Sequence, residues 1–191
     1  MANQRRRRAA RSAPTARPQK AGWRQTIDSF GGFAVIALIL LIVGNPIGFS
    51  QSDDDLLGEA VAYESSTHIE DGTLGPNPPL TPAGGLHYTG PLRAGDYDNP
   101  VSDGNAIHSL EHGFVWITYH PDLVSDDELD TLEDIASDFG RDTILSPRPE
   151  NSFPFIIVSW EQRLTQTDLE EDVLREFVST NRNRSPEPGI R

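Results

Sequence analysis

An apolar run between Phe30 and Phe49 is the strongest constraint on how this chain can fold. It contains no charged residue, and its central part, Phe33–Val43, has no polar side chain. Twenty helical residues span about 30 Å, the thickness of the hydrocarbon core of a bilayer. We therefore expect one transmembrane helix over residues 29–49, in contact with the lipid bilayer. A helix buried in the core of a soluble protein is the alternative.

The charges on the two sides of this run have opposite signs. Residues 1–50 carry eight basic residues and one acid, a net charge of +7, whereas residues 51–191 carry eight arginines and 28 acids, a net charge of −20. Basic residues next to a transmembrane helix remain in the cytoplasm. We therefore expect a single-pass membrane protein with a cytoplasmic N-terminus and an acidic domain outside.

This topology divides the chain into four segments. A cleaved signal peptide is an alternative to a permanent anchor, but Gly44–Gly48 offers no A-x-A cleavage site. We expect a basic cytoplasmic tail over 1–28, an uncleaved signal anchor over 29–49, an acidic juxtamembrane spacer over 50–64 and an extracytoplasmic domain over 65–188.

Composition excludes several classes of ligand. The chain has no cysteine, which excludes disulfides, thiolate metal sites and iron–sulfur clusters. Its one methionine is Met1, on the expected cytoplasmic side, so storage of Cu(I) through thioethers in the outer domain is excluded as well. The net charge of −20 over residues 51–191 argues against nucleic acid as a partner.

Three segments in the second half of the chain have the composition of strands. Phe114–Tyr119 and Phe155–Trp160 are rich in β-branched and aromatic residues, and Thr143–Leu145 is a shorter segment of the same kind. Phe155–Trp160 is apolar on both faces, which is typical of a central strand. Trp116 and Trp160 lie within these segments, so we expect both in the core.

Two helices are predicted between and after these strands. Ser125 and Glu128 form a capping box that opens a helix ending at Gly140. Thr167 and Glu170 form a second capping box that opens the last helix. The resulting class is α+β, a small sheet with two helices packed on one face.

Residues 65–100 are dense in glycine and proline, which excludes long regular elements. They nevertheless include His68, His87, Tyr88 and Tyr97, which a simple spacer does not need. We therefore expect an ordered, irregular Pro/Gly-rich arm that wraps over the domain.

Four of the five histidines lie between residues 68 and 112. On a helix, His108 and His112 would be neighbours four residues apart, so both imidazoles could bind one ion. This requires Asn105–His112 to be helical. His87 and His68 on the arm are the candidates for the remaining ligands, while Glu111 and Tyr88 would contact the ligands. The fifth, His120, is expected to be a lone surface residue.

An all-nitrogen site without thiolates suits copper or zinc. We therefore predict a metal-binding extracytoplasmic domain with His68, His87, His108 and His112 as candidate ligands. Three alternatives remain: a hydrogen-bonded cluster without an ion, a structural subunit of a membrane protein complex, and a hydrolase. The hydrolase reading follows from His108–His112, which matches the H-x-x-E-H pattern in which the glutamate, here Glu111, activates a zinc-bound water. A small-molecule ligand is not indicated by any motif.

The chain resembles a bacterial family catalogued as domain of unknown function 3105. The segments that carry this resemblance are Pro78–Pro79 with His87–Tyr88, Tyr97–Val101, His108–Tyr119, Pro121–Leu123, Ser146–Pro149, Trp160 and Pro186–Glu187. The resemblance covers roughly residues 65–188. It implies a single-span or secreted extracytoplasmic domain and does not supply an activity.

Overall fold

The computed structural model of the chain describes residues 55–190, and the predicted transmembrane helix over 29–49 lies outside them. Among the described residues, no helix is long and apolar enough to cross a membrane. The strands of this described region are β1 (Glu59–Ala60), β2 (His68–Ile69), β3 (His87–Tyr88), β4 (Gly95–Asp96), β5 (Val115–Tyr119), β6 (Thr143–Pro147), β7 (Phe155–Ser159) and β8 (Gln162–Gln166). The helices are α1 (Asp103–Glu111), α2 (Asp126–Phe139) and α3 (Glu171–Asn181), with a 3-10 turn at Gly140–Asp142.

Six of the strands form one mixed sheet in the order β1-β8-β7-β5-β6-β4. β5 and β6 are parallel and are connected through α2, whereas β5, β7 and β8 are antiparallel neighbours. A parallel connection between adjacent strands needs a crossover, and α2 provides it. β2 and β3 form a separate parallel pair.

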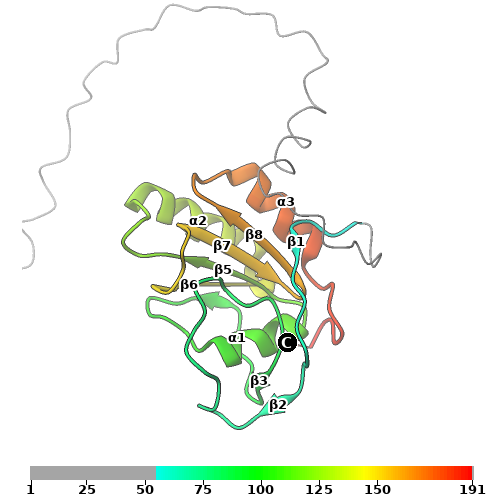
Figure 1. The fold of residues 1–191 in the computed structure, drawn as a ribbon. Coiled ribbons are helices and arrows are strands. Elements are labelled where there is room, and N and C mark those ends of the chain that lie inside the picture. Colours follow the sequence, from blue (N-terminus) through cyan, green and yellow to red (C-terminus); the bar gives the residue numbers. More distant parts are fainter. Residues whose placement is uncertain (1–54, 191) are drawn as a thin grey trace, which may run out of the picture. The chain divides into compact units, whose positions relative to one another are not determined.

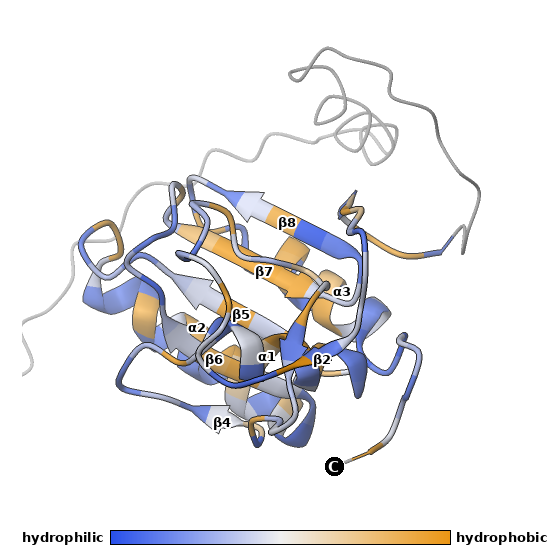
Figure 2. Cartoon of the chain, turned by 60° about the horizontal axis from the view of Figure 1, so that its bottom comes forward, coloured by the Kyte–Doolittle hydropathy of each residue, from blue (hydrophilic) through white to orange (hydrophobic). Residues whose placement is uncertain are grey.

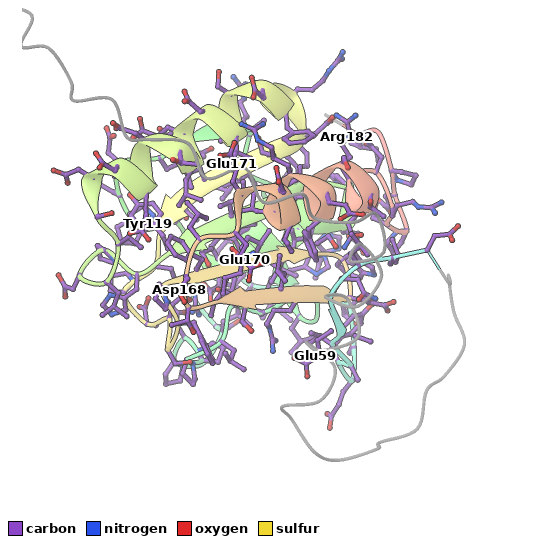
Figure 3. The ribbon with its side chains drawn as sticks, turned by 90° about the horizontal axis from the view of Figure 1, so that it is seen from above. Glu59, Tyr119, Asp168, Glu170, Glu171 and Arg182 are labelled. Carbon is purple, nitrogen blue, oxygen red and sulfur yellow. The ribbon has the colours of Figure 1, made fainter. Side chains whose placement is uncertain are left out.

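The two faces of the sheet are covered by different elements (Figure 1). Successive residues of β5 and β7 point to opposite faces, so each strand contributes to two hydrophobic clusters. One cluster contains Val115, Ile117 and Phe155 and packs against apolar residues of α2 and α3. The other contains Trp116 and Ile156 and packs against α1 and the preceding arm. Figure 3 shows α2 and α3 side by side over the first face.

β7 lies in the interior of the sheet between β8 and β5, as its continuous apolar sequence predicts. All five of its residues are buried, and Figure 2 shows the strand coloured mainly as hydrophobic. Trp116 and Trp160 are both in the core, and the indole N–H of Trp116 donates to the Ser146 hydroxyl (2.9 Å). The α+β class is therefore confirmed, and α2 and α3 are the two helices expected on one face. In the described residues the main sheet has six strands, and a third helix, α1, covers its other face.

The beginning of the last helix differs from the prediction. α3 begins at Glu171, with Glu170 as the N-cap residue and no side-chain hydrogen bond at the cap. The expected capping box at Thr167 is therefore absent. β8 continues to Gln166, and residues 167–170 connect this strand to the start of α3. The Gln166 carboxamide bonds the backbone of Glu170 instead, accepting from its N–H (3.3 Å). Figure 3 labels Glu170 and Glu171 at this end of α3.

The Pro/Gly-rich arm is tied to the rest of the domain by backbone hydrogen bonds. Ser152 N–H donates to the Pro79 carbonyl (2.8 Å), and Glu161 N–H donates to the Ala83 carbonyl (2.7 Å). Residues 59–60, within the segment expected as a spacer, form β1 at the edge of the sheet. The ordered part of the domain thus begins before residue 65.

The capping box that was predicted at α2 is present. Ser125 Oγ accepts from Glu128 N–H (3.4 Å), and Glu128 Oε2 accepts from both Ser125 N–H (2.9 Å) and Ser125 Oγ–H (2.7 Å). The hydrogen bonds from the Ser125 hydroxyl and backbone lower the pKa of Glu128 below its usual value of 4.5. The ionised carboxylate is therefore the form that holds the start of the helix.

We predict that Ser125→Ala lowers the free energy of unfolding by about 1 kcal/mol at neutral pH. Because the pKa of Glu128 is lower in the folded state, this stabilisation is complete above the usual glutamate pKa and is lost as the pH falls through the folded value. Denaturant unfolding should therefore show a smaller difference between variant and wild type in acid. Ser137→Ala, at an exposed position of the same helix, is the matched control; equal effects of the two substitutions would contradict the prediction.

Candidate metal centre

The β2–β3 pair brings two of the candidate histidines together. The two strands are parallel, and His68 is the register partner of His87. Directly paired residues point to the same face of a ladder. Their ring centroids are 4.5 Å apart, with His87 fully buried and His68 exposed.

Helix α1 adds the third histidine to this pair. A Cβ atom at Gly104 would lie 2.5 Å from the Tyr88 ring, so the glycine allows α1 to pack directly against β3. The His108 ring is then 4.7 Å from that of His68 and 5.1 Å from that of His87. One ligand nitrogen from each ring lies within 4.8 Å of the other two.

Hydrogen bonds to the backbone orient two of the three rings. His87 Nδ1 donates to the Gly85 carbonyl (2.8 Å), and His108 Nδ1 donates to the Tyr88 carbonyl (2.7 Å). A carbonyl oxygen can only accept, so the proton of each neutral ring must be on Nδ1. This leaves the Nε2 lone pairs available. Histidines that bind metals are usually oriented by such a bond from the other ring nitrogen.

The surroundings of His108 favour its neutral form. Burial lowers its pKa, and the neighbouring rings of His112, His87 and His68 act in the same direction, against the hydrogen bond to the Tyr88 carbonyl. These effects favour the neutral imidazole, which is the form that can bind a metal.

Glu111 lies on the ligand side of His87. Its Oε2 atom is 3.1 Å from His87 Nε2, a buried nitrogen that has no hydrogen-bond partner among residues 55–190. With the proton on Nδ1, the contact joins two acceptors, which repel each other unless a proton or a metal cation lies between them.

Among the described residues, the nitrogens that converge within 4.8 Å belong to His68, His87 and His108, and His112, the fourth predicted ligand, lies beside this group. The helix ends at Glu111, and His112 is the C-cap residue. Its ring is 4.6 Å from that of His108, but it is not in the group of converging nitrogens. The His112 Nε2 atom is 3.5 Å from Glu187 Oε2. The backbone of Glu187 also contacts the end of α1, where its N–H donates to the Glu111 carbonyl (3.0 Å).

The other predicted residues have different surroundings. Tyr88 contacts the centre through its carbonyl, while its hydroxyl accepts from Leu74 N–H (3.3 Å). His120 lies in a turn, where its Nδ1 accepts from Asp122 N–H (3.1 Å). Glu111 contacts His87 on the side of the lone pair, and so it does not orient the ring through its N–H.

Two aromatic residues beside the centre were not among the predicted site residues. The Trp160 ring lies 6.4 Å from that of His87, and the Tyr63 ring packs edge-on against Trp160 at 5.3 Å. Burial, together with the hydrogen bond to Glu161, raises the pKa of Tyr63 to about 12. Tyr63 and Trp160 are therefore two uncharged aromatic side chains that pack beside His87. No spacing pattern connects Tyr63 with His87, because the arm between them has no regular period.

Comparison with known proteins agrees with the resemblance seen in the sequence. Neither the curated proteins nor the solved structures include a match to this chain. Residues 77–191, more than half of the chain, match the family model described as "Protein of unknown function (DUF3105)". The matched region includes His87, His108 and Glu111. The chain therefore belongs to this family of unknown function.

Proposed function

We propose that this protein binds one divalent transition-metal ion through His68, His87 and His108. The observation that carries the proposal is the convergence of three imidazole nitrogens from three separate segments within 4.8 Å. Two of these rings are held by Nδ1–H bonds to carbonyls, so their lone pairs are available for an ion.

A metal explains this arrangement better than a hydrogen-bonded cluster does. In such a cluster each buried nitrogen would have a protein partner, since unpaired buried polar atoms cost about 1–3 kcal/mol. With its proton on Nδ1, His87 Nε2 has no hydrogen-bond donor among residues 55–190, and it faces the Glu111 Oε2 atom at 3.1 Å. A divalent cation bound to this nitrogen would replace the repulsion with attraction.

The donor set favours copper or zinc. Imidazole nitrogens suit both ions, and for a given nitrogen site Cu(II) binds more tightly than Zn(II). The proposed centre has three neutral ligands, and Glu111 is the anionic group in contact with one of them. His68 is exposed, so an ion could enter from its side.

We also propose that residues 29–49 anchor this domain to the outer face of the cell membrane. The support is the apolar run with a net charge of +7 before it and −20 after it. The arrangement would place the metal centre outside the cytoplasm, where a cysteine-free histidine site is insensitive to the oxidising environment.

We predict that the full-length chain, purified in detergent, binds one equivalent of Cu(II) or Zn(II) in calorimetric titrations. Substituting alanine for His68, His87 or His108 removes one of three ligands and should weaken binding at least 100-fold. His120→Ala, which changes a histidine outside the centre, is the matched control and should leave the affinity unchanged. Failure of the wild type to bind below micromolar concentration would contradict the proposed function.

His112→Ala distinguishes this ligand set from the one that the spacing suggested. Because His112 is not among the converging nitrogens, its loss should change the affinity less than tenfold. An effect as large as that of His108→Ala would show that α1 contributes two ligands and that our ligand set is wrong.

We predict opposite effects of Glu111→Gln on metal binding and on the metal-free protein. The amide can donate to His87 Nε2, which satisfies the unpaired nitrogen and competes with the ion. Metal affinity should fall about 10- to 100-fold, as it does for groups that contact metal ligands. The melting temperature of the metal-free protein should stay the same or rise. A large fall in the melting temperature of the metal-free protein would mean that protonated His87 and Glu111 form an ion pair, which needs no metal.

The absence of cysteine from the natural chain allows a direct test of its topology. In intact cells, a membrane-impermeant thiol reagent should label Ser137→Cys, at an exposed position of α2, and should not label Ser12→Cys in the basic segment. Labelling of both variants only after the cells are broken would place the domain inside and contradict the anchor orientation.

A further inference from the structure

The segments that supply the three histidines contain little regular structure of their own. β2 and β3 have two residues each, and α1 has nine. Backbone pairing over two residues cannot define the positions of rings to within the few tenths of an ångström that coordination requires. The alignment of these segments must therefore come from contacts elsewhere in the domain.

One buried side chain contacts both the helix and the arm. Arg148 follows β6 directly and is 2% exposed. Its guanidinium holds the Asp103 carboxylate with two bonds, from Nε to Oδ1 (3.0 Å) and from Nη2 to Oδ2 (2.7 Å). Nη2 also donates to the Pro78 carbonyl (2.9 Å), and Nη1 donates to Asn151 Oδ1 (2.8 Å).

On the helix side, this ion pair fixes where α1 begins. Asp103 is the first residue of the helix, and the N-cap residue Ser102 makes no side-chain cap hydrogen bond. The two bonds from Arg148 therefore hold the first residue of the helix, next to the packing of Gly104 against the Tyr88 ring. Because α1 is short and rigid, a change at Asp103 is transmitted to His108 and Glu111 on later turns.

On the arm side, the same guanidinium is part of a buried hydrogen-bond network. Asn151 Oδ1 also accepts from Thr81 Oγ1 (2.9 Å), and Asn151 Nδ2 donates to Thr118 Oγ1 of β5 (2.8 Å). Together with the bond to Pro78, this attaches residues 78–81 to the central sheet. His87 follows six residues after Thr81, so its approach to α1 starts from this anchor.

We propose that Arg148 is the positioning residue of the metal centre, which sets the arm that carries His87 against the helix that carries His108. This inference rests on the proposed metal binding. The role requires a planar group with several fixed donors, because one side chain must hold a carboxylate with two bonds and reach two further acceptors. Lysine, with a single ammonium group, cannot reproduce that pattern.

The test separates positioning from stability by removing both charges together. Replacing a buried ion pair with apolar residues of similar volume is often neutral or stabilising, so Asp103→Leu combined with Arg148→Met should fold. If Arg148 positions the centre, this double variant of the full-length chain should bind Cu(II) about 10- to 100-fold more weakly, at temperatures well below its melting temperature. Its copper electron paramagnetic resonance spectrum should show fewer coordinated nitrogens. Unchanged affinity and spectrum in a folded double variant would overturn the proposal.

Two further variants keep the test decisive. If the planar guanidinium is required, Arg148→Lys should also bind Cu(II) more weakly than the wild type. This variant replaces the double variant in the test if the double variant does not fold. Asn181→Ala removes buried hydrogen bonds of α3 to the Leu57 backbone. As a matched control it should lower the melting temperature without changing the affinity. If it weakens binding as much as Arg148→Lys does, the effect is general destabilisation and the proposal fails.

A second readout needs no metal. His87 and His108 are buried, so diethyl pyrocarbonate should modify them slowly in the wild type and faster in the Arg148 variants. Faster modification supports positioning even if the wild type binds no ion, in which case only the proposed function fails. Unchanged protection in a folded variant counts against positioning whatever the metal result.

Discussion

The close packing of α1 against β3 is the contact on which the candidate centre depends. It is allowed by the missing side chain at Gly104, which faces the Tyr88 ring. The same approach brings the Tyr88 carbonyl to His108 Nδ1, so one contact both positions and orients the ring. A larger residue at position 104 would separate the helix from the strand and remove the hydrogen bond together with the convergence. The packing of α1 against β3 therefore also determines the position and orientation of the His108 ring.

The two faces of the sheet differ in composition, and the candidate centre lies on one of them. The face covered by α2 and α3 is a largely apolar cluster, which resembles the core of an ordinary small α+β domain. The face covered by α1 and the arm combines apolar packing with buried polar groups, including His87, Arg148 and Asn151. Buried polar groups stabilise a fold only when each is satisfied. The satisfied network around Arg148 and the unsatisfied His87 Nε2 on this same face therefore have different roles.

Most elements with strong local patterns were predicted correctly, with the exception of the capping box at Thr167. Elements that form through tertiary pairing were harder to predict. β5, α2 and β7 follow from composition, the Ser125 cap and apolar periodicity. β8 was missed because Gln162–Gln166 is mostly polar, and it forms a strand through its pairing with β7. Spacing alone could not decide between His112 and Glu111 as the neighbour of the centre, because positions i+3 and i+4 are both adjacent to His108 on a helix. In the described part of the chain, Glu111 Oε2 lies 3.1 Å from His87 Nε2, whereas His112 is outside the group of converging nitrogens.

The acidic surface and the histidine centre act on cations at different ranges. A net charge of −20 on residues 51–191 raises the local concentration of all cations and speeds their encounter with the domain. It does not select among them, since exposed carboxylates suit calcium and magnesium as well as transition metals. Under the proposed function, selection would come from the imidazole nitrogens at the centre, which calcium and magnesium do not favour. The long-range attraction weakens as the ionic strength rises, whereas direct coordination by imidazole nitrogens depends on ionic strength much less. Under the proposed function, added salt should therefore slow the binding of the ion without changing which ion is bound.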